Sequence, residues 1–257
     1  MSGETAPETS LDGFLGGRLR LAQPKRGYRA GTDPVLLAAS VPAKAGERCL
    51  DLGCGVGTAA LCLSLRTGAV CDGVEVQPEY AALAEQNAAA NDLPLTVWQA
   101  DLMALPTSLR QQSFDHVMLN PPYFAQGAGT AASDPGRDLA LRDRGDLRDW
   151  LGVAVRRTKP KGSVTVIART DRLPELMAAV PTHLGSLRLQ PLVARAGRPA
   201  KRFVLQGFKD GRAPFVLCAP LVLHEGETHL RDGDDASNSA QEILRNGAKL
   251  RFLDADR

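Results

Sequence analysis

The sequence has few aromatic residues and no long hydrophobic run. Phe, Trp and Tyr make up 5% of its 257 residues, and its apolar stretches end well short of the roughly 20 residues that a membrane-spanning helix requires. The N-terminus also lacks a basic segment followed by an apolar one, which is the pattern of a secretory signal. We therefore expect a cytoplasmic protein with no membrane partner.

The cysteines and histidines do not form the patterns of disulfide or metal sites. There are five cysteines, an odd number, and none belongs to a C-x-x-C pair, which argues against a disulfide framework and against a zinc site. The four histidines also lack metal-ligand spacing, so we expect no metal. The net charge of +2 does not by itself indicate a nucleic-acid partner, and local basic clusters must decide that question.

Short apolar strands alternate with helical segments from about residue 47. This alternation predicts a doubly wound α/β fold, in which a mainly parallel sheet carries helices on both faces. Two β-rich runs, 187–195 and 202–208, predict an antiparallel strand pair that closes the sheet. A long loop at 125–144 and a turn at 159–162 are expected between the later elements.

The same pattern divides the chain into four parts. Its length suffices for one full-sized hydrophobic core, so folding requires no oligomer and a monomer is favoured. The predicted parts are a disordered tail at 1–12, an N-terminal extension at 13–46, the α/β domain at 47–223 and a polar C-terminal tail at 224–257.

Glycines and acidic residues follow the ends of successive predicted strands. Asp51–Gly57 has the spacing G-x-G-x-G, whereas dinucleotide sites more often show G-x-G-x-x-G. Glu75 ends the second strand, Asp101 follows the third and Asn120 follows the fourth. The carboxyl ends of parallel strands form the ligand-binding edge of such sheets, where Glu75 can accept both ribose hydroxyls and Asp101 the adenine amine. This arrangement predicts binding of S-adenosyl-L-methionine by Asp51, Gly53, Gly55, Gly57, Glu75, Asp101 and Asn120.

The tetrapeptide Asn120-Pro121-Pro122-Tyr123 is the candidate catalytic motif. Its two prolines stiffen the backbone in an extended conformation. The lone pair of an amine conjugated to a ring is delocalised, and the Asn120 side-chain oxygen and the Pro121 carbonyl could accept the amine hydrogens and direct that lone pair at a methyl group. Tyr123 offers an aromatic face to a planar substrate. A base inside a duplex could not reach such a pocket, so a target base must be looped out or flipped.

These motifs together resemble a class I amino-methyltransferase, with a Rossmann-like, seven-stranded sheet. Gly31-Thr32-Asp33-Pro34-Val35-Leu36-Leu37 narrows the resemblance to the bacterial tRNA1(Val) adenine-N6-methyltransferase family. The resemblance implies that Gly31, Thr32 and Asp33 help enclose the methionine end of the cofactor, so that residues 13–46 pack on its site. It also implies that the substrate is an adenosine of the tRNA anticodon loop.

Two clusters of basic residues give independent support for an RNA partner, since such groups contact phosphates. They could equally form a solvated surface. The clusters are Arg18, Arg20, Lys25, Arg26 and Arg29 before the glycine loop, and Arg195, Arg198, Lys201 and Arg202 at the predicted hairpin.

Other functions remain open from the residues alone. A protein glutamine methyltransferase would use the same tetrapeptide on a planar amide, but such enzymes carry a helical domain for which the segment before residue 47 is short. Methylation of guanine N2 in ribosomal RNA is a further alternative. A binder without turnover would not need both Asn120 and Glu75, and an NAD-dependent reductase would leave the tetrapeptide unexplained.

Overall fold

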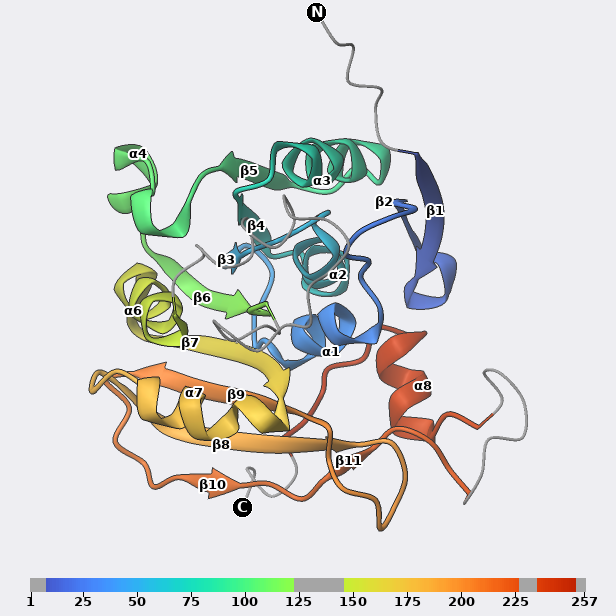
Figure 1. The fold of residues 1–257 in the computed structure, drawn as a ribbon, viewed down its shortest axis with the longest axis vertical. Helices are drawn as coiled ribbons and strands as arrows, with labels where there is room; N and C mark the ends of the chain where they lie inside the picture. Colours follow the sequence, from blue (N-terminus) through green and yellow to red (C-terminus); the bar gives the residue numbers. More distant parts are fainter. Residues whose placement is uncertain (1–7, 123–145, 227–234, 253–257) are drawn as a thin grey trace, which may run out of the picture.

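The computed structural model describes residues 8–122, 146–226 and 235–252. In these segments nine strands form one mixed sheet in the order β10-β8-β9-β7-β6-β3-β4-β5, with β11 paired to β8. Figure 1 shows this order running from β5 near the top to β10 near the bottom. The predicted doubly wound α/β fold is therefore confirmed, and the two-residue strands β10 and β11 extend the expected seven-stranded sheet at one edge.

The five strands from β5 to β7 pair in parallel, and β9 is antiparallel to both of its neighbours, β7 and β8. The strands are β3 (Arg48–Leu52), β4 (Val70–Glu75), β5 (Leu95–Gln99), β6 (Phe114–Leu119), β7 (Thr158–Arg169), β8 (Leu184–Val193), β9 (Arg202–Lys209), β10 (Val216–Leu217) and β11 (Leu221–Val222). The helices are α1 (Thr32–Ser40), α2 (Thr58–Thr67), α3 (Pro78–Ala90), α4 (Thr107–Arg110), α6 (Leu147–Arg157), α7 (Leu173–Ala179) and α8 (Asn238–Leu244), with 3-10 turns η1 (Leu15–Gly17), η2 (Leu102–Ala104) and η3 (Thr170–Arg172).

Helices cover both faces of the sheet. Neighbouring residues of each central strand point to opposite sides, so each strand contributes side chains to both layers of packing. On β6, Met118 joins the apolar cluster formed with α1, α2, α3 and α8. Val117 and Leu119 join the cluster formed with α4, α6 and α7. The sheet is thus buried on both faces, and its carboxyl edge is left to bind ligands.

A hairpin of β1 (Thr9–Phe14) and β2 (Leu19–Pro24) precedes the main sheet and forms a separate antiparallel pair. The expectation of a disordered tail at 1–12 is therefore wrong from Thr9 onward. The polar composition of this segment suggested disorder, but β1 alternates exposed and half-buried side chains and gains its backbone hydrogen bonds from β2.

Two later expectations also need correction. Residues 159–162 form a bulge inside β7 rather than a turn before it, since Thr158 pairs with Phe114 and Ser163 already pairs with His116. The expected polar tail contains α8, whose Ala240 and Ile243 are buried. The Ser237 hydroxyl caps that helix by accepting a hydrogen bond from the Ala240 N–H at 3.1 Å.

None of the helices in the described segments is long and apolar enough to cross a membrane. The loop expected at 125–144 lies outside the described residues.

Candidate active site

The glycine loop between β3 and α2 is folded back against β4. The N–H groups of Gly53 and Cys54 both donate to the Val74 carbonyl, at 2.8 and 3.0 Å. Gly53 has a φ of 72°, and a Cβ there would stand 2.9 Å from the Trp150 ring on α6. A side chain at this position is therefore excluded both by the backbone conformation and by the packing of Trp150.

Glu75 at the end of β4 fixes the next part of this loop. One carboxylate oxygen accepts a hydrogen bond from the Gly55 N–H at 3.0 Å, and the other accepts one from the Gln77 N–H at 2.9 Å. The side chain is buried, with 5% exposure. The predicted grouping of glycine loop and second-strand acid is therefore present, and Glu75 also holds the loop in place.

Asp51, the last acid before the loop, is buried with its Oδ2 atom unpartnered in the described structure. Burial raises the pKa of this carboxyl to about 7, the Ala60 backbone N–H opposes that shift, and the nearby Glu75 charge adds to it. A buried carboxyl oxygen without a donor is costly unless a ligand supplies one. Asp51 is thus suited to receive a donor or cation from a ligand.

Asn120 directly follows β6 at the same edge of the sheet. Its side-chain N–H₂ group lies 3.4 Å from the Tyr28 hydroxyl, toward which it donates. Its Oδ1 atom is buried and accepts no hydrogen bond in the described part of the chain. The geometry thus presents one acceptor at the start of the tetrapeptide, where sequence analysis predicts the reacting amine.

Tyr28 contacts both the glycine loop and Asn120, although its sequence context did not indicate this role. Its ring lies 3.9 Å from the position of a Cβ on Gly55, and its hydroxyl faces Asn120. Its backbone N–H donates to the Tyr80 hydroxyl at 2.9 Å, which anchors the segment to α3. Nothing in the spacing around Tyr28 distinguishes it from a surface tyrosine, so only the tertiary fold reveals this placement.

Two further positioning residues were also missed. The buried Asn87 on α3 exchanges two hydrogen bonds with the Ala22 backbone and donates a third to the Val56 carbonyl, tying the N-terminal hairpin to the glycine loop. Arg172 donates to the Pro122 carbonyl at 3.0 Å and pairs with Glu175 through two nitrogens. Arg172 therefore fastens the tetrapeptide to α7.

The remaining predicted residues lie around the same edge. Asp101 caps η2 by accepting from the Met103 N–H at 2.8 Å and is exposed. Gly31 precedes α1 and has open space where a Cβ would stand, and Thr32 is the first residue of that helix. The Asp33 carboxylate accepts from Arg202 at 2.6 Å and so links α1 to β9. Pro121 is buried and Pro122 half-buried, whereas Tyr123 lies outside the described residues.

Sequence comparisons relate this chain to known methyltransferases. Residues 30–134 match the model of the methyltransferase small domain. A tRNA1(Val) (adenine(37)-N6)-methyltransferase from Aeromonas hydrophila is 31% identical over 201 residues, covering 76% of this chain and 82% of that protein. One from Haemophilus influenzae is 26% identical over 250 residues, covering 94% of this chain and all of that protein.

Solved structures show the same fold. A predicted O-methyltransferase from Agrobacterium tumefaciens has a TM-score of 0.68 at 26% identity, over 86% of this chain and all of that one. The 16S rRNA N2 G1207 methyltransferase of Thermus thermophilus has a TM-score of 0.54 at 20% identity, over 79% of this chain and 50% of that one.

The sheet order, the glycine loop and the acid that ends β4 define a class I methyltransferase. The identity and coverage shared with the curated relatives narrow this class, and the chain belongs to the tRNA1(Val) (adenine(37)-N6)-methyltransferase family.

Proposed function

We propose that this protein uses S-adenosyl-L-methionine to methylate the N6 amine of an adenine in tRNA, at an adenosine of the anticodon loop. The observation that carries the proposal is the buried Oδ1 atom of Asn120, which has no hydrogen-bond partner among the described residues, at the ligand edge of a methyltransferase fold. A planar amine can donate a hydrogen bond to that atom.

The residues at this edge fit the cofactor. Asp51 has a buried oxygen with no donor in the described chain, and the space beside Gly55 is open up to the Tyr28 ring. Glu75 would hold the ribose hydroxyls, Asp101 the adenine amine, and residues 31–33 with Asp51 the methionine end. When bound, adenosylmethionine supplies a methyl group activated by a positively charged sulfur.

The protein's part in the reaction is to orient the amine. The Asn120 oxygen and the Pro121 carbonyl would accept the two amine hydrogens, which turns the nitrogen lone pair toward the methyl group. The Asn120 side chain is held by Tyr28, and Arg172 holds the backbone of the tetrapeptide. Fixed dipoles of this kind stabilise the charge that develops on the amine, so no strong general base is required.

Similarity to the curated relatives favours the N6 amine of an RNA adenine over guanine N2 or a glutamine amide as the acceptor. The curated relatives are named for adenine in tRNA1(Val), whereas the ribosomal guanine enzyme matches half of its own length. Five free cysteines are consistent with work in the reducing cytoplasm.

Isotopic labelling tests the proposal. The protein should be incubated with total bacterial tRNA and cofactor carrying a deuterated methyl group, and the tRNA then digested to nucleosides for mass spectrometry. The expected product is labelled N6-methyladenosine. Label in N2-methylguanosine, or in glutamine of added protein with none in RNA, would overturn the proposed substrate.

A further inference from the structure

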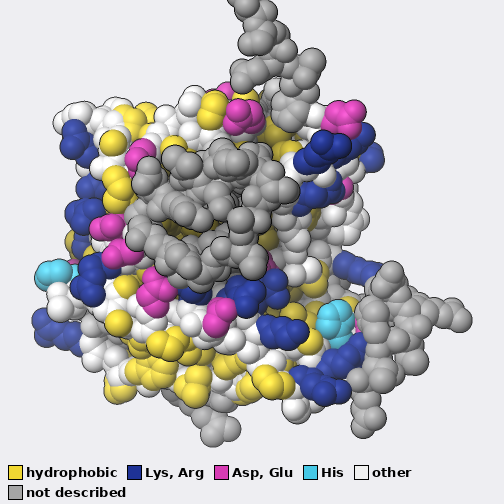
Figure 2. Space-filling model, viewed as in Figure 1, with side chains coloured by type: hydrophobic (Ala, Val, Ile, Leu, Met, Phe, Trp, Pro, Cys, Tyr) yellow, Lys and Arg dark blue, Asp and Glu magenta, His cyan; other side chains and the backbone are white. Residues whose placement is uncertain are grey.

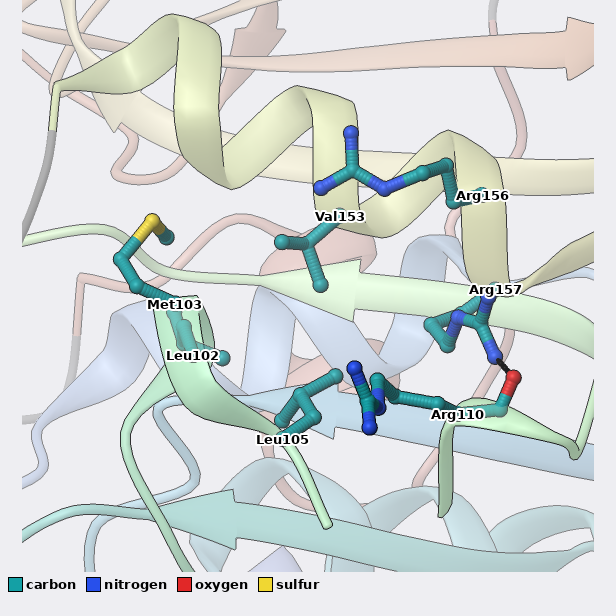
Figure 3. Close-up of a pocket in the computed structure, with 7 residues that line it drawn as sticks. All are labelled: Leu102, Met103, Leu105, Arg110, Val153, Arg156 and Arg157. Carbon is teal, nitrogen blue, oxygen red and sulfur yellow. Dashed lines mark hydrogen bonds between the residues drawn. The ribbon is translucent and has the colours of Figure 1, made fainter. Parts of the chain in front are cut away.

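A cavity of about 240 Å³ lies between α6 and the segment from η2 to α4. Figure 3 shows arginine side chains from α4 and α6 around it, with apolar side chains of η2 and α6 forming the remaining wall. The apolar wall consists of Leu102, Met103, Leu105 and Val153. This cavity is on the face of the sheet covered by α6, beside the C-terminal half of that helix.

Among the described residues that line the cavity, the charged ones are three arginines, Arg110, Arg156 and Arg157. Arg157 donates to the carbonyls of Leu109, Arg110 and Gln112 and so caps the end of α4. Burial lowers the pKa of Arg157, and repulsion from Arg156 and Arg110 lowers it further. Positive charge therefore accumulates here, and the described lining residues include no carboxylate to offset it.

Arg110 and Arg156 are both exposed and make no ion pair within the described chain. Arg110 donates to the Thr107 hydroxyl at 3.0 Å. Arg156 folds back along α6 over Gly152, where a Cβ would approach its Nη1 atom to 3.1 Å. Glycine inside a helix is less favourable than alanine, and here it leaves room for the arginine to lie beside the cavity.

The basic clusters expected from sequence have a different environment. Several of their members are held by acidic partners: Lys25 by Glu8, Arg29 by Asp12, Arg195 by Asp235 and Arg202 by Asp33. In Figure 2, Lys and Arg side chains also gather along the side of the molecule where α4 and α6 lie. The arginines of the cavity differ from these four residues, because no acidic side chain of the described residues holds Arg110 or Arg156.

We propose that Arg110 and Arg156 bind one backbone phosphate of the RNA substrate, and that Arg157 in the same cavity lining adds positive charge without contacting it. The proposal rests on the proposed RNA substrate. Arg156 lies six residues beyond Trp150, which packs under the glycine loop; at about 1.5 Å per helical residue this separation is about 9 Å. The cavity is lined by the same helix that packs under the glycine loop, and guanidinium groups suit phosphate oxygens.

The test compares two charge-matched double variants of the full chain. Arg110→Gln with Arg156→Gln removes the proposed contact and leaves the structural Arg157 intact. Lys44→Gln with Arg212→Gln removes two exposed charges elsewhere. The affinity of each for tRNA is measured at several salt concentrations, together with adenosylhomocysteine affinity, melting temperature and methyl transfer by the wild type.

The slope of log affinity against log salt should lose about 1 in magnitude for the cavity variant, because one phosphate contact is lost. The control variant should keep the wild-type slope, and both should keep the wild-type cofactor affinity and melting temperature. Equal slopes for the two variants, with a wild type that labels tRNA, would overturn the phosphate site alone. A wild type that neither binds nor labels tRNA would overturn the substrate proposal and the phosphate site together.

Discussion

Glu75 ends one parallel strand and Asn120 directly follows another at the ligand edge, but their polar atoms are paired very differently. Both Glu75 oxygens accept backbone N–H groups within the chain, whereas the Asn120 Oδ1 atom is buried with no partner in the described structure. The part of the site proposed to bind the cofactor therefore contains a side chain, Glu75, that also stabilises the fold. The part proposed to bind the substrate keeps the Asn120 oxygen as an acceptor for a ligand. Substitutions of Glu75 should therefore affect cofactor binding, and substitutions of Asn120 should affect the methyl-transfer rate.

The largest effect is expected at Asn120. Asn120→Ala should lower the single-turnover rate at saturating tRNA by about 10²–10³-fold, as loss of one preorganised polar group does in other active sites. Adenosylhomocysteine affinity, measured by calorimetry, should stay within about twofold. Asn120→Asp keeps an acceptor and should retain more of the rate than the alanine variant. If both variants were equally active, or if cofactor affinity fell with the rate, Asn120 would not be the amine acceptor.

Asp51 should make the stability of the ligand-free protein fall with rising pH. Its folded pKa of about 7 lies above the ordinary 3.8, so the folded state holds a proton that the unfolded chain releases between these values. The stability that this proton on Asp51 adds to the folded state is present below pH 4 and is lost as pH rises to about 7. The stability of Asp51→Asn relative to wild type should therefore be greater at pH 8 than at pH 5 by about 2.5 kcal/mol, since about two pH units separate pH 5 from the folded pKa. Urea unfolding at both pH values measures this difference, and a difference near zero would contradict the buried, protonated state.

Glu75→Ala should weaken adenosylhomocysteine binding by about tenfold or more, because charge-assisted hydrogen bonds contribute about 1.5–3 kcal/mol each. The structure adds an expected loss of stability, since the Gly55 and Gln77 N–H groups lose their acceptor. Glu79→Ala, at an exposed position in the first turn of α3, is the matched control and should change neither quantity. Unchanged calorimetric affinity in folded Glu75→Ala protein would remove this residue from the cofactor site.

Much of the fold was accessible from sequence because its pattern is local. The alternation of apolar strands and helices predicted the parallel sheet, and the glycine spacing placed the loop between β3 and α2. The antiparallel pair β8 and β9 was also predicted from two β-rich runs. Strand β1 was missed because its stability comes from pairing with β2, which a polar composition does not reveal.

The site was predictable only in part. Glu75 and Asn120 could be found because Glu75 ends one apolar strand and Asn120 directly follows another. Tyr28, Asn87 and Arg172 could not, since each acts on a segment distant in sequence: Asn120, Ala22 and Pro122, respectively. The unpartnered state of the Asn120 oxygen is likewise a property of tertiary packing.

The central claim, that the Asn120 oxygen accepts a hydrogen bond from the exocyclic amine, can be tested by a binding cycle. Wild-type protein and Asn120→Ala are each titrated, with adenosylhomocysteine present, against an anticodon-loop RNA containing the target adenosine and against one containing purine ribonucleoside, which lacks the amine. Wild type should prefer adenosine by about fivefold, or about 1 kcal/mol, and the variant should show no preference. The same preference in both proteins would contradict the claim, because the amine would then be recognised without Asn120.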